Sequence, residues 1–481
     1  MNPAQQRTVT VSGAQGDLTA ALDGKLVNVT IDQATHIVTV TATQATGTDT
    51  LHLVDAAGAR ADVPIRVAFN AGTIVPQATL KVTGNPADPA WLVAQVQALV
   101  ARLTSSLPGA QTTIAPVQPL ATPLAPGQQA QITVPVQISG GGQYFDQSGT
   151  TSVSVQNLPA GQYLPAALVY DDDPEHLMQD GVIYRGTISS AQGVRLYYYH
   201  ENGNDPRHFY VALSTAVNDP ASVQVTNSSA GPNIDVMSVG HAVTKNFLLM
   251  KPLDEGVILD LQPGAFTPIV DTSVGAREGI AGTIDFHVLN GGPVAVTILA
   301  ASPGTDPQTL LSQPVLPGDG HHRRGTFALA SFGNDALTYS AGGPDAKLVY
   351  ADRAASPPNA EPGNNGTDFG DYGVMHTIVF TLENPTDTAS NAYLYERPLG
   401  GGVRSSFLVD GRLVELGCAR EPVPYQIAAY SLQPRQTYHL VVQTMTDGGS
   451  SYPIEVGVTS TPPQPGTPSI SAPDGCFPKH Q

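Results

Sequence analysis

Charge is scarce in this chain, and basic charge is the scarcest. Of the 481 residues, 13% are charged, with 22 Lys and Arg against 40 Asp and Glu, whereas typical soluble domains carry about 25% charged residues. The net charge of −18 lacks the basic footprint of a nucleic-acid-binding protein, so we expect no nucleic-acid partner. No apolar run reaches the roughly 18 residues that a membrane-spanning helix needs, so we expect no transmembrane segment.

Sequence motifs of well-known enzyme classes are also missing. The chain contains no G-x-S-x-G nucleophile turn, no phosphate-binding glycine loop, no dinucleotide-binding fingerprint and no zinc-binding helix motif. These absences favour a protein without enzymatic activity. They leave open a glycoside hydrolase, because its paired carboxylates lie far apart in sequence.

Cysteine is nearly absent as well, with Cys418 and Cys476 as the only two. An even pair fits a disulfide that ties the C-terminal tail to the preceding domain in an oxidising compartment, and it equally fits two unrelated thiols. The first residues hold no apolar segment, so we expect no signal peptide in the sequence as given. Abundant Thr, Ser, Gln, Gly and Pro are typical of secreted bacterial β-proteins, which favours a secreted or cell-surface location.

Alternating, β-branched segments dominate residues 7–70 and are separated by Gly, Asp or Asn. About five strands in about 65 residues predict a small antiparallel sandwich over 1–72. The stretch 36–67, HIVTVTATQATGTDTLHLVDAAGARADVPIRV, resembles the bacterial Ig-like modules found in surface proteins and at the N-termini of secretion and pilus proteins. The resemblance implies a spacer or interaction module rather than an active site.

One helix is expected, in a small α+β unit over 73–140. Asp88 precedes Pro89, the favoured order of an N-cap and a first helical residue. Apolar residues then recur at helical spacing from Leu92 to Leu103 and place one face of the helix against a core. We expect no other long helix in the chain.

Strand patterns return over most of the remaining chain, and we expect β-sandwiches over 141–344 and 345–461 and a Pro-rich extended tail over 462–481. The stretch 432–442, LQPRQTYHLVV, resembles the tyrosine corner of Ig-like and fibronectin-type sandwiches. That resemblance implies that the Tyr438 hydroxyl bonds to backbone. The predicted fold class is therefore mainly β: tandem antiparallel β-sandwich (Ig-like) domains with one small α+β domain.

Two segments suggest binding chemistry. The acidic segment DDDPEH (171–176) supplies Asp171, Asp173 and Glu175 as candidate calcium ligands, since Ca²⁺ prefers oxygen ligands; the alternative is a solvated acidic loop. In the predicted strand 197–200, alternation puts Tyr197 and Tyr199 on one face of the sheet and Tyr198 and His200 on the other. Such aromatic rows stack sugars, bind a partner protein or pack across strands.

These observations favour an extracellular or cell-envelope structural or adhesive protein: a surface-layer, fibre or binding-module subunit. Its partners would be other copies of itself, cell-surface components or glycans, and Ca²⁺ the one candidate cofactor. Assembly is expected through sandwich edges, with 131–138 and 152–156 as candidate edge strands and loose termini before Thr8 and after Thr459. One alternative is a secreted carbohydrate-active or other hydrolytic enzyme on the central sandwiches, using segments 171–175 and 197–200. Another is a periplasmic secretion or pilus component.

Overall fold

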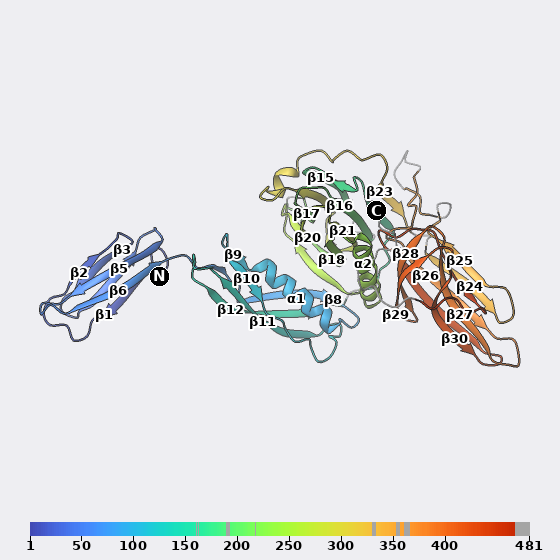
Figure 1. The fold of residues 1–481 in the computed structure, drawn as a ribbon, viewed down its shortest axis with the longest axis horizontal. Helices are drawn as coiled ribbons and strands as arrows, with labels where there is room; N and C mark the ends of the chain where they lie inside the picture. Colours follow the sequence, from blue (N-terminus) through green and yellow to red (C-terminus); the bar gives the residue numbers. More distant parts are fainter. Residues whose placement is uncertain are drawn as a thin grey trace. The chain divides into compact units, whose positions relative to one another are not determined.

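The computed structural model (Figure 1) describes residues 1–159, 161, 163–188, 193–216, 218–329, 333–352, 356–359 and 366–466. Mostly antiparallel β-sheets build it, which confirms the predicted fold class. The chain forms two compact units, the first from 1–80 and 88–157 and the second from 81–87 and 158–481. Within the described residues, helices long and apolar enough to cross a membrane are absent.

The N-terminal sandwich is made of two three-stranded sheets, ordered β1-β4-β3 and β2-β5-β6. Apolar side chains alternate inward along the central strands and form one core that includes Val38 and Leu51. The strands are β1 (Gln6–Thr10), β2 (Thr19–Leu22), β3 (Val27–Asp32), β4 (Ile37–Ala42), β5 (Gly47–Val54) and β6 (Arg60–Val67). The expected loose N-terminus is wrong: β1 pairs with β4, and the Met1 amine donates to the Arg66 carbonyl at 2.8 Å.

The α+β part of the first unit contains the expected helix, α1 (Pro89–Leu103). The Asp88 carboxylate caps it by accepting from the backbone N–H groups of Ala90 and Trp91. Its buried face differs in part from the expected one, because Leu103 is exposed while Val93 and Val100 are buried. The strands are β7 (Gly72–Thr73), β8 (Gln77–Thr83), β9 (Ser105–Ser106), β10 (Gln111–Ile114), β11 (Gln129–Ser139) and β12 (Gln147–Asn157).

Two expectations about this part are wrong for the same reason. β11 and β12 pair along their length, so the expected boundary at residue 140 lies inside a hairpin, and the first unit continues to Asn157. In the sheet order β10-β11-β12-β8, both strands also have neighbours on two sides. The pairing with β10 covers Val136–Ser139 of β11, and β8 lies beside β12, so 136–138 and 152–156 are interior segments of the sheet; the expected edge at 131–138 is wrong for its last residues.

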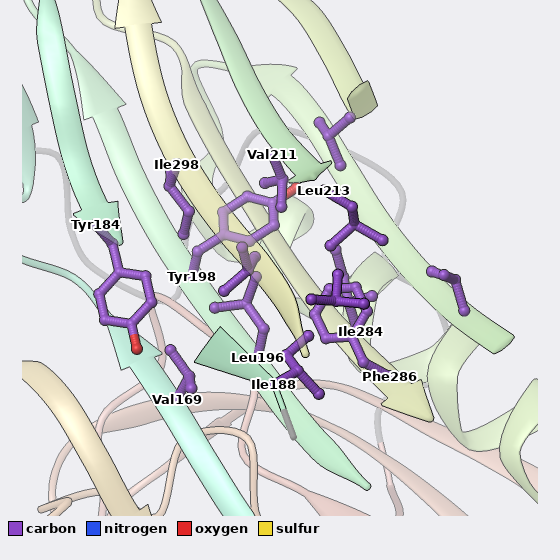
Figure 2. Close-up of a cluster of buried hydrophobic side chains, with 14 of the residues drawn as sticks. Val169, Tyr184, Ile188, Leu196, Tyr198, Val211, Leu213, Ile284, Phe286 and Ile298 are labelled. Carbon is purple, nitrogen blue, oxygen red and sulfur yellow. The ribbon is translucent and has the colours of Figure 1, made fainter. Parts of the chain in front are cut away.

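The central sandwich opens the second unit. Its two sheets are ordered β19-β18-β21-β16-β13-β23, with β14 beside β16, and β15-β22-β17-β20. Figure 2 shows their side chains interleaving, with Tyr198, Phe286 and Ile298 in one buried cluster. The strands are β13 (Ala167–Asp171), β14 (His176–Leu177), β15 (Gly181–Ile188), β16 (Val194–Asn202), β17 (Arg207–Thr215), β18 (Ala221–Asn233), β19 (Gly256–Leu261), β20 (Thr267–Val274), β21 (Gly279–Gly291), β22 (Val294–Ala301) and β23 (Arg324–Ala328).

A second long helix, α2 (Val236–Met250), was not expected from the sequence. Asp235 caps it, and the short 3-10 helix η1 (Lys251–Leu253) continues it; a further 3-10 helix, η2 (Pro307–Leu310), lies in a later loop. One side of α2 packs on β18 and β21, and it also contacts β28 and β31 of the C-terminal sandwich. The helix thereby joins the two sandwiches of the second unit.

The C-terminal sandwich has sheets ordered β24-β26-β31-β28-β29 and β25-β32-β27-β30 around a core that includes Phe380 and Phe407. The strands are β24 (Asn334–Ser340), β25 (Ala346–Tyr350), β26 (Met375–Glu383), β27 (Ser390–Pro398), β28 (Gly402–Val409), β29 (Arg412–Arg420), β30 (Tyr425–Leu432), β31 (Thr437–Met445) and β32 (Ile454–Thr459). Because β24 pairs with β26, this sandwich already includes residues before the expected boundary at 345.

The expected tyrosine corner is also corrected. The Tyr438 ring is half-buried, and its hydroxyl donates to the Asp410 carboxylate instead of to backbone. The start of the tail is attached rather than loose, because Gln464 exchanges backbone hydrogen bonds with Pro424 and Gln426 at 3.0 and 2.8 Å. Residues 467–481 lie outside the described part of the chain.

Candidate functional site

A cavity of about 410 Å³ lies between the central and C-terminal sandwiches of the second unit. Strands β13 and β16 contribute side chains from the central sandwich, and the loops before β26, β28 and β32 contribute from the C-terminal one. Five tyrosines line it: Tyr170, Tyr197, Tyr199, Tyr372 and Tyr452. A cavity of this size is within the range that holds small ligands.

Strand register explains how tyrosines from distant parts of the chain meet. β13 and β16 run parallel with Tyr170 opposite Tyr197, and their rings stack with centroids 5.4 Å apart. Tyr372 stacks on Tyr197 at 5.7 Å, and Tyr452 meets Tyr372 edge-on at 5.7 Å. The result is a continuous row of four aromatic rings along one wall of the cavity.

The predicted faces of β16 are confirmed. Tyr197 and Tyr199 pack in one buried cluster on the cavity side, while Tyr198 lies in the core of the central sandwich. His200 lies on the same side of β16 as Tyr198, since the centre of the His200 ring is 5.5 Å from that of Phe209 in the same core. Cross-strand packing and cavity lining are thus combined on one side of the strand.

Polar groups of opposite sign stand beside the row of rings. The Asp172 carboxyl accepts from the Tyr170 hydroxyl at 3.1 Å. The Glu175 carboxylate lies 2.7 Å from Nε2 of His322, whose Nδ1 lies 2.7 Å from Asp319. The Arg323 guanidinium lies 5.4 Å from the centre of the Tyr170 ring. The cavity therefore offers hydrogen-bond donors and acceptors next to flat apolar faces.

Burial shifts the pKa of two carboxyl groups, Asp172 on the cavity wall and Asp368 near Arg323. Burial raises the pKa of Asp172 well above its usual range, and the negative charge of Glu175 raises it further. Burial also raises the pKa of Asp368, which lies close to Arg323. Burial therefore favours the protonated form of both carboxyl groups, and a protonated carboxyl is able to donate a hydrogen bond.

Arg323 keeps its positive charge in this environment. Burial alone lowers the pKa of its guanidinium, but Tyr170, Asp368 and Asp172 act in the opposite direction, and the net pKa is raised. Its Nη1 atom also donates to the Thr367 carbonyl at 3.4 Å. The cavity wall thus carries one fixed cation over an aromatic ring.

The predicted calcium ligands do not converge. Asp171 is fully buried 3.5 Å from His200, Asp173 accepts from the Asp319 backbone N–H, and Glu175 faces His322. Within the described residues, no group of three or more His, Cys, Asp or Glu is placed to hold a metal ion. This geometry does not support the calcium hypothesis: β13 ends at Asp171, Asp173 and Glu175 lie in the loop that follows, and each carboxylate faces a different protein group.

Cys418 on β29 is disulfide-bonded. The expected partner, Cys476, lies outside the described residues. The pairing of Cys418 with Cys476 therefore stays a prediction.

Several residues of the cavity were missed in the sequence. Asp172 lies inside the acidic segment that was singled out, but it was not among its named ligands. Arg323 and His322 were not named as candidate site residues, and Tyr372 and Tyr452 follow no local pattern. A tyrosine after a glycine-rich turn is a signal too common to identify a site without the fold.

Comparisons with known proteins give no family. No protein-family model and no curated protein matches the chain. Among solved structures, it is similar to SGBP-B of the Bacteroides ovatus mixed-linkage glucan utilization locus in complex with a mixed-linkage heptasaccharide, at 9% identity, TM-score 0.15, and 62% and 71% coverage of this chain and that one. It is also similar to the endo-fucoidan hydrolase MfFcnA4 (11%, 0.14, 56% and 41%) and to a titin I-band fragment (9%, 0.12, 44% and 75%). Similarities this low assign neither a fold family nor an activity.

Proposed function

We propose that the chain is an extracellular or cell-envelope adhesive protein whose tyrosine-lined cavity binds a glycan. The observation that carries the proposal is the convergence of four contacting tyrosine rings with Asp172, Glu175 and Arg323 on one cavity of about 410 Å³. Sugars present flat C–H faces surrounded by hydroxyl groups. Aromatic faces bordered by the Asp172 and Glu175 carboxyl groups and the Arg323 guanidinium match both features.

Binding ranks ahead of edge-to-edge polymerisation in this proposal. Among the sheet edges of the described sandwiches, β6, β20 and β29 carry charge or proline, which native proteins use to block strand addition, whereas β2 and β30 carry neither. These residues are Arg60, Asp62, Pro64 and Arg66 on β6, Pro268 and Asp271 on β20, and Arg412, Glu415 and Arg420 on β29. Partners that are other copies of the chain are therefore a weaker part of the proposal than glycans.

Calorimetric titration of the full chain with neutral and uronic-acid oligosaccharides tests the proposal. We expect binding to one class, weakened at least about tenfold, or about 1.4 kcal/mol, by Tyr372→Ala, which removes a stacked ring, and by Glu175→Gln, which removes an acceptor charge. Tyr438→Ala is the matched control, because this half-buried tyrosine lies in the same sandwich outside the cavity.

The outcome that contradicts glycan binding is equally clear. If no oligosaccharide binds to the natural chain, or if Tyr438→Ala weakens binding as much as Tyr372→Ala, the cavity is not a glycan site. Circular dichroism of each variant confirms that a loss of binding is not a loss of fold.

A second function, glycoside hydrolysis, is favoured by one observation. Glycosidases use a protonated carboxyl as acid and a second carboxyl as base or nucleophile. Asp172 has its pKa raised, and Glu175, which adds to that shift, lines the same cavity. If the chain is an enzyme, it should release reducing ends from the bound glycan, and Asp172→Asn should abolish release while binding persists. Binding without release in the natural chain removes this candidate.

A further inference from the structure

Thr83 and Gln224 meet in the dry interior of the second unit, away from the cavity. Thr83 is the last residue of β8 and Gln224 lies on β18. The Gln224 Nε2 donates to the Thr83 Oγ1 at 3.0 Å, and the two residues are 0–1% exposed. A hydroxyl and a primary amide are thus held in contact where water does not compete.

A glycine in the intervening strand makes this contact possible. β19 lies between β8 and β18, with Gly256 directly beside Thr83. A Cβ at Gly256 would lie 3.1 Å from the Gln224 Cγ and 3.2 Å from the Thr83 Oγ1. The missing side chain leaves the space through which residues two strands apart reach each other.

Groups able to move protons surround the amide. The Gln224 side chain also hydrogen-bonds the Asp254 carboxyl, whose pKa is raised by burial. His287 stands opposite Gln224 in the pairing of β18 with β21, and burial lowers the pKa of its imidazole. Its Nδ1 is buried without a hydrogen-bond partner, and so is the Gln224 Oε1. A carboxyl whose pKa is raised and an imidazole whose pKa is lowered therefore flank an amide whose buried carbonyl oxygen lacks a hydrogen-bond partner among the described residues, which a purely structural pair would avoid.

We propose that Thr83 and Gln224 join in an intramolecular ester. The Thr83 Oγ1 attacks the Gln224 Cδ, the C–O bond forms, the C–N bond breaks, and the nitrogen leaves as ammonia. The Asp254 carboxyl protonates the departing nitrogen and is restored by the proton that the hydroxyl loses, with His287 as a second acceptor beside the amide. One hydroxyl and one amide thus give one ester and one ammonia, and no oxidant or other reactant is needed. The buried position then shields the ester from hydrolysis.

Such a bond would add a covalent link to a segment that hydrogen bonds and one ion pair already hold, among them those of Thr83 with Asp254, Asn85 with Leu253 and Lys81 with Asp260. The chain gives residues 81–87 to the second unit and returns to the first at Asp88. The strand pairing that holds β8 to β19 is limited to Thr83 with Gly256 and Val82 with Val257. A covalent link from Thr83 to the longer strand β18 would replace this short ladder as the main attachment.

Intact-mass spectrometry of the natural full chain tests the proposal without any substitution. After reduction of the disulfide at Cys418, the expected mass is that of the sequence less one molecule of ammonia. Trypsin should then yield the peptides 82–102 and 208–245 as one covalently joined species, which mild alkali separates. A chain of full sequence mass, or two separate peptides before alkali, overturns the ester.

Two threonine variants localise the bond. Thr83→Ala should restore the full mass, and Thr83→Ser should keep the ammonia loss, because serine retains the nucleophile. Thr226→Ala is the matched control: Thr226 is equally buried beside Gly256, and its hydroxyl donates to the Glu255 carbonyl as that of Thr83 donates to the Asp254 carbonyl, but it is Thr83 to which Gln224 donates. Ammonia loss that persists in Thr83→Ala, or that disappears in Thr226→Ala, assigns the mass change to another site and overturns the proposal.

Discussion

Two groups of buried charge in the second unit are built in opposite ways. At the first, the fully buried Asp285 contacts Arg195 at 2.6 Å and Lys251 at 2.9 Å. Burial raises the pKa of Asp285, but these two cations outweigh it and the net pKa is lowered. At the second, Asp172 on the cavity wall is almost as buried, yet its nearest charged neighbours include Glu175, and its pKa is raised.

The difference in neighbouring charge distinguishes a carboxylate that stabilises the fold from a carboxyl that could take part in chemistry. A buried carboxylate with two cations is ionised and fixed, and it holds together β16, β21 and η1, the elements that carry the three residues. At Asp172, burial and the charge of Glu175 outweigh the opposing effect of Arg323, so the protonated form, which can donate or exchange a proton, is favoured. Burial alone therefore does not identify a functional acid; the charge of its neighbours decides.

The largest effect is expected where the matched charges are broken. Asp285→Ala leaves Arg195 and Lys251 buried without their anion, and we expect the free energy of unfolding to fall by about 3–5 kcal/mol in urea denaturation. Asp387→Ala is the control, because its pair with Arg435 is largely exposed and should contribute less than about 1 kcal/mol. Equal losses in the two variants would contradict the comparison.

A smaller effect is expected from Glu396 on β27, a fully buried carboxyl whose pKa is raised by burial from 4.5 to about 8. Between these pH values the folded chain binds the proton and the unfolded chain does not, so the free energy of unfolding falls as pH rises. One such group contributes about 1.4 kcal/mol per pH unit, or about 3 kcal/mol between pH 5 and pH 7.

Urea denaturation across that pH range measures the Glu396 effect as a difference between variants. Glu396→Gln should remove the decline that this group causes, whereas Glu421→Gln, at an exposed position, should leave the pH profile of the natural chain unchanged. A Glu396→Gln profile parallel to the natural one would show that the group is ionised in the folded state.

The smallest effect on stability is expected at the cavity wall. Because burial raises the pKa of Asp172 and favours its protonated form, Asp172→Asn introduces an amide of similar shape and charge that still accepts from Tyr170. We expect the free energy of unfolding, measured by thermal denaturation at neutral pH, to change by less than about 1 kcal/mol. A loss of several kcal/mol would mean that Asp172 is an ionised, matched carboxylate like Asp285.

Local patterns in the sequence predicted much of the fold. The alternation in β4 and β5 and the Asp88–Pro89 cap of α1 are properties of short segments, and they gave the sandwich and the first helix correctly. Helix α2 was missed because it contacts strands of two sandwiches, so its buried residues lie on several sides and leave no clear polar face.

The candidate site was predictable only in part. Tyr197, Tyr199 and the segment of Glu175 are local signals, and the structure brings them to one cavity. Their partners Tyr372 and Tyr452 arrive through the packing of two sandwiches, which no local pattern encodes. The same limit explains why β11 and β12 were mistaken for edges, since an edge is defined by which strands pair and not by composition.

The passage of residues 81–87 into the second unit also sets an order of events during folding. Thr83 can form its strand pairing only after Gly256, which lies 173 residues further along the chain, has been synthesised. A growing chain therefore completes the N-terminal sandwich early, while the end of β8 waits until the middle of the central sandwich has been synthesised. Such long-range closure is slow, and it leaves an unpaired strand end exposed meanwhile. Residues 81–87 are thus the segment that a molecular chaperone would bind first.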